Sequence, residues 1–272
     1  MVDFMDTIMA DEYLARRYKA PAREDFPLPD EDFTSVWRGW IEGRGDAFPG
    51  DVRALLRGAK VWLEDTPAGR IPVVSTEDRR TFERLTAIFS MEDEGRALLA
   101  SVNALTVPAK HPMFAGHRVI FLAKGGYSAL RAEDAGETED EWVRKSAVIR
   151  LNHECCHYFT LRVLGGMKNH ALDEVIADCA GQLSAFGRYD ASLQRKFFGL
   201  DGDRVASGGR LGYYVRKLPE GAIPTVCRKV SEALTGLEGY LEKNAEMTRI
   251  PRRPDLIIKL ATIGLGGIAE LA

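Results

Sequence analysis

Two histidines four residues apart, His153 and His157, are the residues of this sequence best placed to do chemistry. They stand in the stretch NHECCHYFTLRVLGG, residues 152–166. Positions i and i+4 of an α-helix leave the same face one turn apart, so the two imidazoles can bind one small cation. Glu154 lies about 100° round the helix from His153, where it can reach a water on the metal but not easily the metal itself. This is the H-E-x-x-H pattern of metal-dependent hydrolases.

A second acidic stretch adds a third ligand. Residues 171–186 read ALDEVIADCAGQLSAF, and Glu174 and Asp178 share one face of the helix that this pattern predicts. A buried pair of like charges is costly unless a cation neutralises it. A catalytic zinc takes three protein ligands and keeps one open position, which His153, His157 and Glu174 would satisfy. Asp178 can then accept the second ring N–H of a ligand histidine and fix its tautomer.

Several alternatives stay open from the residues alone. The two histidines could be satisfied by hydrogen bonds inside a buried helix, with no metal at all. Asp173 precedes Glu174 directly and is a rival ligand. His170 either caps the second helix or serves as an alternative ligand. Two imidazoles and a carboxylate suit Zn²⁺, but such a site also accepts iron, manganese or cobalt.

The two helices together resemble those of the zincin metalloproteases of the gluzincin, thermolysin-like type. The resemblance covers about residues 118–186 and rests on HExxH followed by ExxxD. It implies zinc-dependent hydrolysis of peptide or amide bonds, with a zincin-like core around a central HExxH helix. The resemblance implies that His153, His157 and Glu174 are the zinc ligands. It implies that Glu154 is the general base and that Asp178 accepts a hydrogen bond from a ligand histidine.

The sequence departs from that family in three places. The link between His157 and Glu174 is shorter than in thermolysin, and Asp173 stands where thermolysin-like enzymes have asparagine. No histidine follows His170 to stabilise an oxyanion. The phenol of Tyr213 or Tyr214 could stabilise the oxyanion instead, or the two rings could pack as an aromatic pair. His111 or His117 could also reach the site as the oxyanion donor, or both could lie on the surface.

The cysteines and tryptophans are expected to be structural. Cys155 falls on the side of the helix opposite the histidines, and Cys156 lies nearer to them but still off their face. Free cysteine commonly packs as a small apolar residue, although a redox or ligand role is the alternative. The tryptophans at 37, 40 and 62 are expected in the core.

The elements that must position the site are mainly helical. A central helix over 139–164 is expected, opened by a capping box of Thr138 and Glu141, and a second helix over 171–186. Residues 118–123, RVIFLA, are the clearest strand, about where zincins keep the edge strand that pairs with a peptide substrate. We also expect helices over 3–19, 31–42 and 50–57, from Thr76 to about Phe89, and over 92–105. Residues 61–75 are expected to form a hairpin or irregular chain. Three or four further helices are expected within 191–272.

These elements define the predicted fold class and organisation. The class is α+β, mainly α, with a small β element before the central helix and a helical C-terminal part. We expect a mainly helical region over 1–110, a metal-site core over 111–190, and a helical region over 191–272, packed into one globular unit.

Composition and charge narrow the function classes. The chain has 272 residues and a net charge of −3, which gives no electrostatic reason to expect nucleic acid or an acidic membrane. The N-terminus does not read as a secretory signal, and residues 256–272 are expected to form a core helix rather than a membrane span. A cytoplasmic protein is the expectation.

The sequence therefore predicts a zinc-dependent hydrolase that uses Glu154 as general base on a peptide or small amide substrate. The alternative is a non-catalytic, metal-containing intracellular domain that works by contact with another protein.

Overall fold

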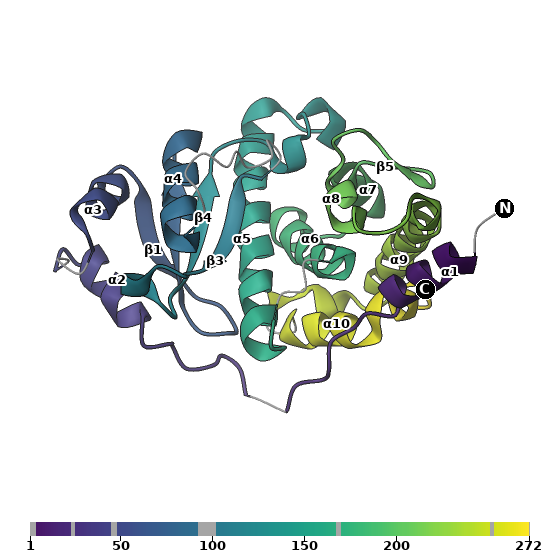
Figure 1. The fold of residues 1–272 in the computed structure, drawn as a ribbon, viewed down its shortest axis with the longest axis horizontal. Coiled ribbons are helices and arrows are strands. Elements are labelled where there is room, and N and C mark those ends of the chain that lie inside the picture. Colours follow the sequence, from purple (N-terminus) through teal and green to yellow (C-terminus); the bar gives the residue numbers. More distant parts are fainter. Residues whose placement is uncertain are drawn as a thin grey trace.

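Helices dominate the fold, and one small mixed sheet accompanies them. The computed structural model describes residues 4–22, 25–44, 48–91, 102–166, 170–250 and 253–271. The longest helix, α5 (Glu139–Val163), stands at the centre, with the sheet on one side and most other helices on the other (Figure 1). This arrangement confirms the predicted α+β, mainly α class.

The sheet has the strand order β1-β2-β4-β3. Its first two strands form an antiparallel hairpin, which confirms the hairpin alternative for residues 61–75. The pairing of β2 with β4 is parallel, and that of β3 with β4 is antiparallel. The strands are β1 (Lys60–Glu64), β2 (Ile71–Thr76), β3 (Ala104–Pro108) and β4 (Arg118–Ala123).

Three helices pack on the sheet around an aromatic cluster that includes Trp37, Phe89 and Phe121. They begin and end close to the predicted positions. Their bounds are α2 (Thr34–Ile41), α3 (Gly50–Arg57) and α4 (Arg79–Ser90). Trp37 is fully buried here, as expected. Three of the four strands come before residue 110 and β4 comes after it, so the sheet combines residues from the first two regions expected from the sequence.

Three expectations about the sheet side are wrong. Residues 118–123 form a strand, but β4 lies between β2 and β3, so the edge strand is β3. Most of the helix expected over 92–105 lies outside the described residues, and its end belongs to β3, where Ala104 and Leu105 pair with β4. Thr76 lies in β2, and Asp78 caps α4 instead by accepting from the Thr81 N–H at 2.8 Å.

The opposite side of α5 is helical (Figure 1). It holds α6 (Ala171–Phe186), α7 (Ala191–Phe198), α8 (Arg210–Val215), α9 (Ile223–Lys243) and α10 (Arg253–Ala269). The described part of the C-terminal region thus has four helices, as expected, and it adds a short pair of strands, β5 (Leu200–Asp201) and β6 (Arg204–Val205). The N-terminal helix α1 (Phe4–Leu14) packs against α9 and α10. Short 3-10 turns occur at Pro112–Phe114, Tyr127–Ala129, Glu133–Ala135, Glu220–Ala222 and Ala245–Thr248.

The C-terminal helix α10 is a core element, as predicted, and it buries Leu256, Leu260 and Ile268. In the part of the chain that the structure describes, no helix has both the length and the apolar character needed to cross a membrane.

Both helices that carry the candidate ligands are capped by polar side chains. Thr138 accepts a hydrogen bond from the Glu141 N–H at the start of α5, as the capping-box pattern predicts. His170 caps α6 by accepting from the Leu172 N–H, and Asp173 accepts in return from the His170 N–H. These contacts satisfy backbone N–H groups that a helix start leaves free.

Helices α5 and α6 approach closely where Gly181 faces Ile149. A Cβ built on Gly181 would lie 2.9 Å from both Cγ2 and the carbonyl oxygen of Ile149. A side chain at position 181 would therefore force the two helices apart. The missing Cβ is what allows this distance between the helices.

We predict that Gly181→Ala lowers the free energy of unfolding by about 1–3 kcal/mol, because overpacking at the crossing outweighs the better helix propensity of alanine. Urea unfolding followed by circular dichroism measures the change. Gly39→Ala in α2 is the matched control, since nothing lies within 4 Å of a Cβ built there. This control should raise stability by about 0.5–1 kcal/mol. An equal gain from both substitutions would contradict the close contact.

Candidate metal centre

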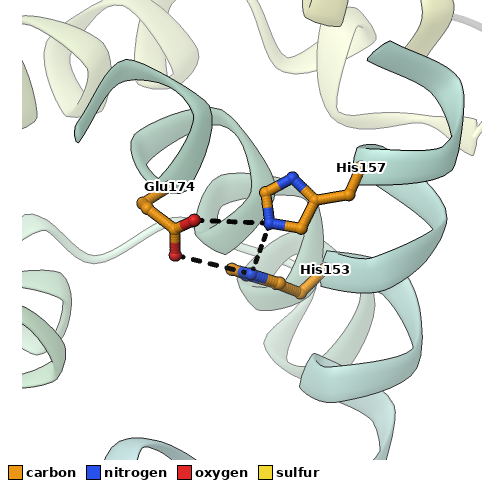
Figure 2. Close-up of side chains that lie close together, drawn as sticks. All are labelled: His153, His157 and Glu174. Carbon is orange, nitrogen blue, oxygen red and sulfur yellow. Dashed lines mark hydrogen bonds and ion pairs between the residues drawn. The ribbon is translucent and has the colours of Figure 1, made fainter. Parts of the chain in front are cut away.

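Three side chains from α5 and α6 converge on one point. The Nε2 atoms of His153 and His157 lie 2.9 Å apart. Glu174 faces both, with Oε2 3.6 Å from His153 Nε2 and Oε1 3.4 Å from His157 Nε2 (Figure 2). All three residues are buried. The sequence analysis named these residues as the ligand set, and the structure brings them together.

The spacing of these atoms fits one transition metal ion. Ligand atoms about 2.0–2.2 Å from a tetrahedral zinc lie about 3.3–3.6 Å from one another. The distances of 2.9, 3.4 and 3.6 Å come close to that range without any rearrangement of the helices. Two imidazole nitrogens and one carboxylate are also a usual donor set for catalytic zinc. His153, His157 and Glu174 are therefore the residues that would hold the ion.

Asp178 holds the far side of the His153 ring. Its Oδ1 lies 2.9 Å from His153 Nδ1, so the ring presents Nε2 to the other two ligands. The Tyr127 hydroxyl donates to the same Oδ1 at 2.5 Å and lies 2.8 Å from His153 Nδ1. Arg210 forms an ion pair with the other oxygen, Oδ2. The role that the sequence analysis gave Asp178 thus matches its position.

His157 is supported differently. Its Nδ1 is buried and has no hydrogen-bond partner among the described residues. Burial alone would lower the pKa of His157, but the hydrogen bond and charge of Glu174 raise it to about 9. The two histidines hold the pKa of Glu174 well below its usual range, although burial opposes this. Without a metal, the site therefore favours a proton on His157 and a charged Glu174.

Glu154 reaches the site from the same helix but is held by the sheet. It is 5% exposed. The Thr106 hydroxyl, on edge strand β3, donates to Glu154 Oε2 at 2.8 Å and also lies 3.0 Å from the Glu154 carbonyl oxygen. Among the described residues, no hydrogen bond to Oε1 of this carboxylate is found. Thr106 thus orients one carboxylate oxygen and leaves the other available.

The rival ligands lie elsewhere. Asp173 accepts from the Tyr18 hydroxyl and from the His170 N–H, and it is not part of the ligand group found among the described residues. The His170 ring lies 3.0 Å, through Nε2, from the Tyr13 carbonyl oxygen. Both side chains build the start of α6, since position 173 points to the N-terminal segment while position 174 points to α5.

Several residues around the site had no signal in the sequence. Tyr127 and Arg210 contact Asp178, and Thr106 contacts Glu154, yet each is far from the motif in sequence. Tyr214 was one of two tyrosines considered. Burial, together with the charge of Glu174, raises the pKa of its phenol well above the usual value.

The other candidates do not join the ligand group. Tyr213 stacks under the Arg216 guanidinium at 3.6 Å from the ring centroid. His111 caps a 3-10 turn, and His117 packs between Phe33 and Phe114.

The four cysteines carry free thiols. Burial raises the pKa of Cys155 and Cys156 well above the usual value, which keeps both thiols protonated at neutral pH.

The fold and site together bring three side chains on two packed helices into an arrangement that could hold a metal ion, and the HExxH glutamate follows the first of them in the chain. The chain belongs to a family of unknown function, DUF7005, whose model matches residues 106–272, more than half of the chain. That range begins within β3, at Thr106, and includes both helices that carry the candidate ligands. No curated protein and no solved structure matches the chain.

We predict that His157→Ala abolishes stoichiometric binding of zinc, because two ligands remain. Asp178→Asn should weaken zinc binding by about 10–100-fold, because the ring of His153 loses its charged acceptor. Competition with a chromophoric chelator measures both affinities. Stoichiometric, tight zinc in the His157→Ala variant would contradict the ligand assignment.

We predict that Asp173→Ala affects stability rather than zinc binding. The variant should bind zinc like the original chain, but it should unfold more easily by about 1 kcal/mol, because the start of α6 loses the hydrogen bonds that Asp173 accepts from the His170 N–H and the Tyr18 hydroxyl. Metal analysis and urea unfolding on the same preparation separate the two effects. If Asp173→Ala loses zinc and Glu174→Ala retains it, the wrong carboxylate has been assigned.

Proposed function

We propose that the protein is a metal-dependent hydrolase of peptide or amide bonds. The observation that carries the proposal is the triangle of His153, His157 and Glu174, with Asp178 behind His153. A zincin-like core around α5 and α6 is part of the same proposal, and zinc is the metal that the donor set suits best. When bound, zinc supplies a Lewis acid that polarises a carbonyl and lowers the pKa of water toward neutrality.

Glu154 is the general base in this proposal. Its carboxylate is fixed by Thr106 through Oε2, which leaves Oε1 to take a proton from the attacking water. As the water oxygen bonds to the carbonyl carbon and the C–N bond breaks, Glu154 returns that proton to the leaving nitrogen. The base sits next to His153 in the chain, so the helix itself fixes its position relative to the ligands.

The negative charge that develops on the carbonyl oxygen needs a donor. Tyr214 is the stronger of the two tyrosine candidates, because burial and the charge of Glu174 raise the pKa of its phenol. The raised pKa keeps this phenol protonated at neutral pH, so it can donate a hydrogen bond. This placement fills the role for which the sequence has no histidine after His170.

The second candidate function is a non-catalytic domain that contains a metal and acts by contact with another protein. The observation that favours it is the low exposure of the site, since the ligands and Glu154 are each between 5% and 8% exposed. Zinc uptake without any hydrolysis would support this candidate.

We predict that Glu154→Gln keeps the zinc and the fold but lowers turnover by about 10²–10⁴-fold, because glutamine cannot accept a proton at neutral pH. The measurement compares zinc-loaded proteins on a library of peptides and acyl amides. Glu141→Gln is the matched control, since Glu141 lies on the same helix, is exposed and pairs with Arg144. Equal hydrolysis by the original chain and Glu154→Gln would show that the activity comes from elsewhere.

A further inference from the structure

Arg150 is a buried cation on the helix that carries the metal ligands. It is only 3% exposed and lies one turn before His153 on α5. Residues three and four positions apart share a helix face, so Arg150 lies on the face that carries His153 and Glu154.

Among the residues that the structure describes, the charge of Arg150 has no counterion. Its Nη1 donates to the carbonyl oxygen of Gly125 at 2.6 Å, while its Nε is buried and has no partner. No carboxylate within the described ranges forms an ion pair with it, and burial lowers its pKa to about 10. Arg210, whose side chain is 11% exposed, instead faces both Asp178 and Glu174. A buried charge without a partner is expensive, so Arg150 is built to meet an anion.

The surroundings of Arg150 place that anion along the edge strand. Gly125, which accepts from Arg150, follows β4, and a Cβ built on it would lie 3.5 Å from the Asn103 side chain just before β3. Farther along the same strand, Thr106 holds Glu154. Arg150 therefore lies near the start of β3, and Glu154 lies next to its middle.

We propose that Arg150 binds a carboxylate of the substrate, which lies one or two residues from the cleaved bond. Positions 150 and 154 are about 6 Å apart along the helix axis, and an extended chain covers about 3.3 Å per residue. The planar guanidinium offers the carboxylate parallel N–H groups, including the Nε–H that has no partner. This proposal rests on the proposed hydrolase function and narrows its substrate to a peptide or amide with a nearby carboxylate. That carboxylate is either a C-terminus or an acidic side chain.

The test measures binding rather than turnover. The zinc-loaded Glu154→Gln protein is titrated by calorimetry with acetylated alanine tripeptides, as free acid and as C-terminal amide. A second pair carries glutamate or glutamine at the middle position. In at least one pair the acid should bind about 10-fold or more tightly than its neutral counterpart. The pair that shows the difference tells a C-terminal carboxylate from a side-chain carboxylate.

Further substitutions in the same background assign the effect. Arg150→Gln should abolish the preference, and Arg150→Lys should keep part of it. Arg195→Gln is the matched control, since Arg195 is half-buried and bonds Ser231 and Thr235 away from the site. It should leave the preference unchanged.

Equal binding of acid and neutral peptides by the protein with Arg150 would overturn the inference, as would no binding of any acid. A preference that survives in Arg150→Gln would overturn it too. The comparison with Arg150 intact can decide on its own, even if Arg150→Gln does not fold. Failure to take up zinc or to hydrolyse any peptide counts against the hydrolase function, whereas the absence of an acid preference in the protein that keeps Arg150 counts against the role of Arg150.

Discussion

The close antiparallel contact of α5 and α6 is the constraint on which the site depends. Where Gly181 faces Ile149, the helices approach without an intervening Cβ. From that point the pairs follow in register, Asp178 with His153 and Glu174 with His157, because both helices repeat their faces every four residues. A wider spacing between the helices would separate the carboxylates from the imidazoles by more than one metal ion can bridge. A small residue far from the chemistry thus sets the geometry of the ligands.

The charges of the site form a second constraint. Three carboxylates, those of Glu154, Glu174 and Asp178, are buried, and the single charge of Arg210 pairs with two of them, Asp178 and Glu174. Burial penalises uncompensated charge, so the site needs further positive charge. In the absence of metal, the raised pKa of His157 meets part of this need with a proton. A divalent cation would meet the need more fully and would displace that proton.

The helices and the ligand set could be predicted from the sequence, because their signals are local. HExxH and ExxxD are spacings within one helix, and Thr138 marks a helix start through its own neighbours. The strand β3 could not be predicted, because so short a stretch becomes a strand only by pairing with β4. Its position at the edge of the sheet could not be predicted either. The contacts of Arg210 and Tyr127 with Asp178 could not be predicted for the same reason, because tertiary packing alone brings these residues together.

The attachment of the N-terminal segment to the start of α6 bears on the order in which the protein folds. Tyr18 donates to Asp173 across 155 positions of chain, and the Tyr13 hydroxyl accepts from the Ala171 N–H. Closing so long a loop costs entropy that the local contacts within a helix do not have to offset, so we expect these contacts to form after the helices that they join. The residue after Asp173 is the ligand Glu174. We therefore expect the start of α6, next to the candidate ligand Glu174, to gain its contacts with the N-terminal segment after α5 and α6 have formed.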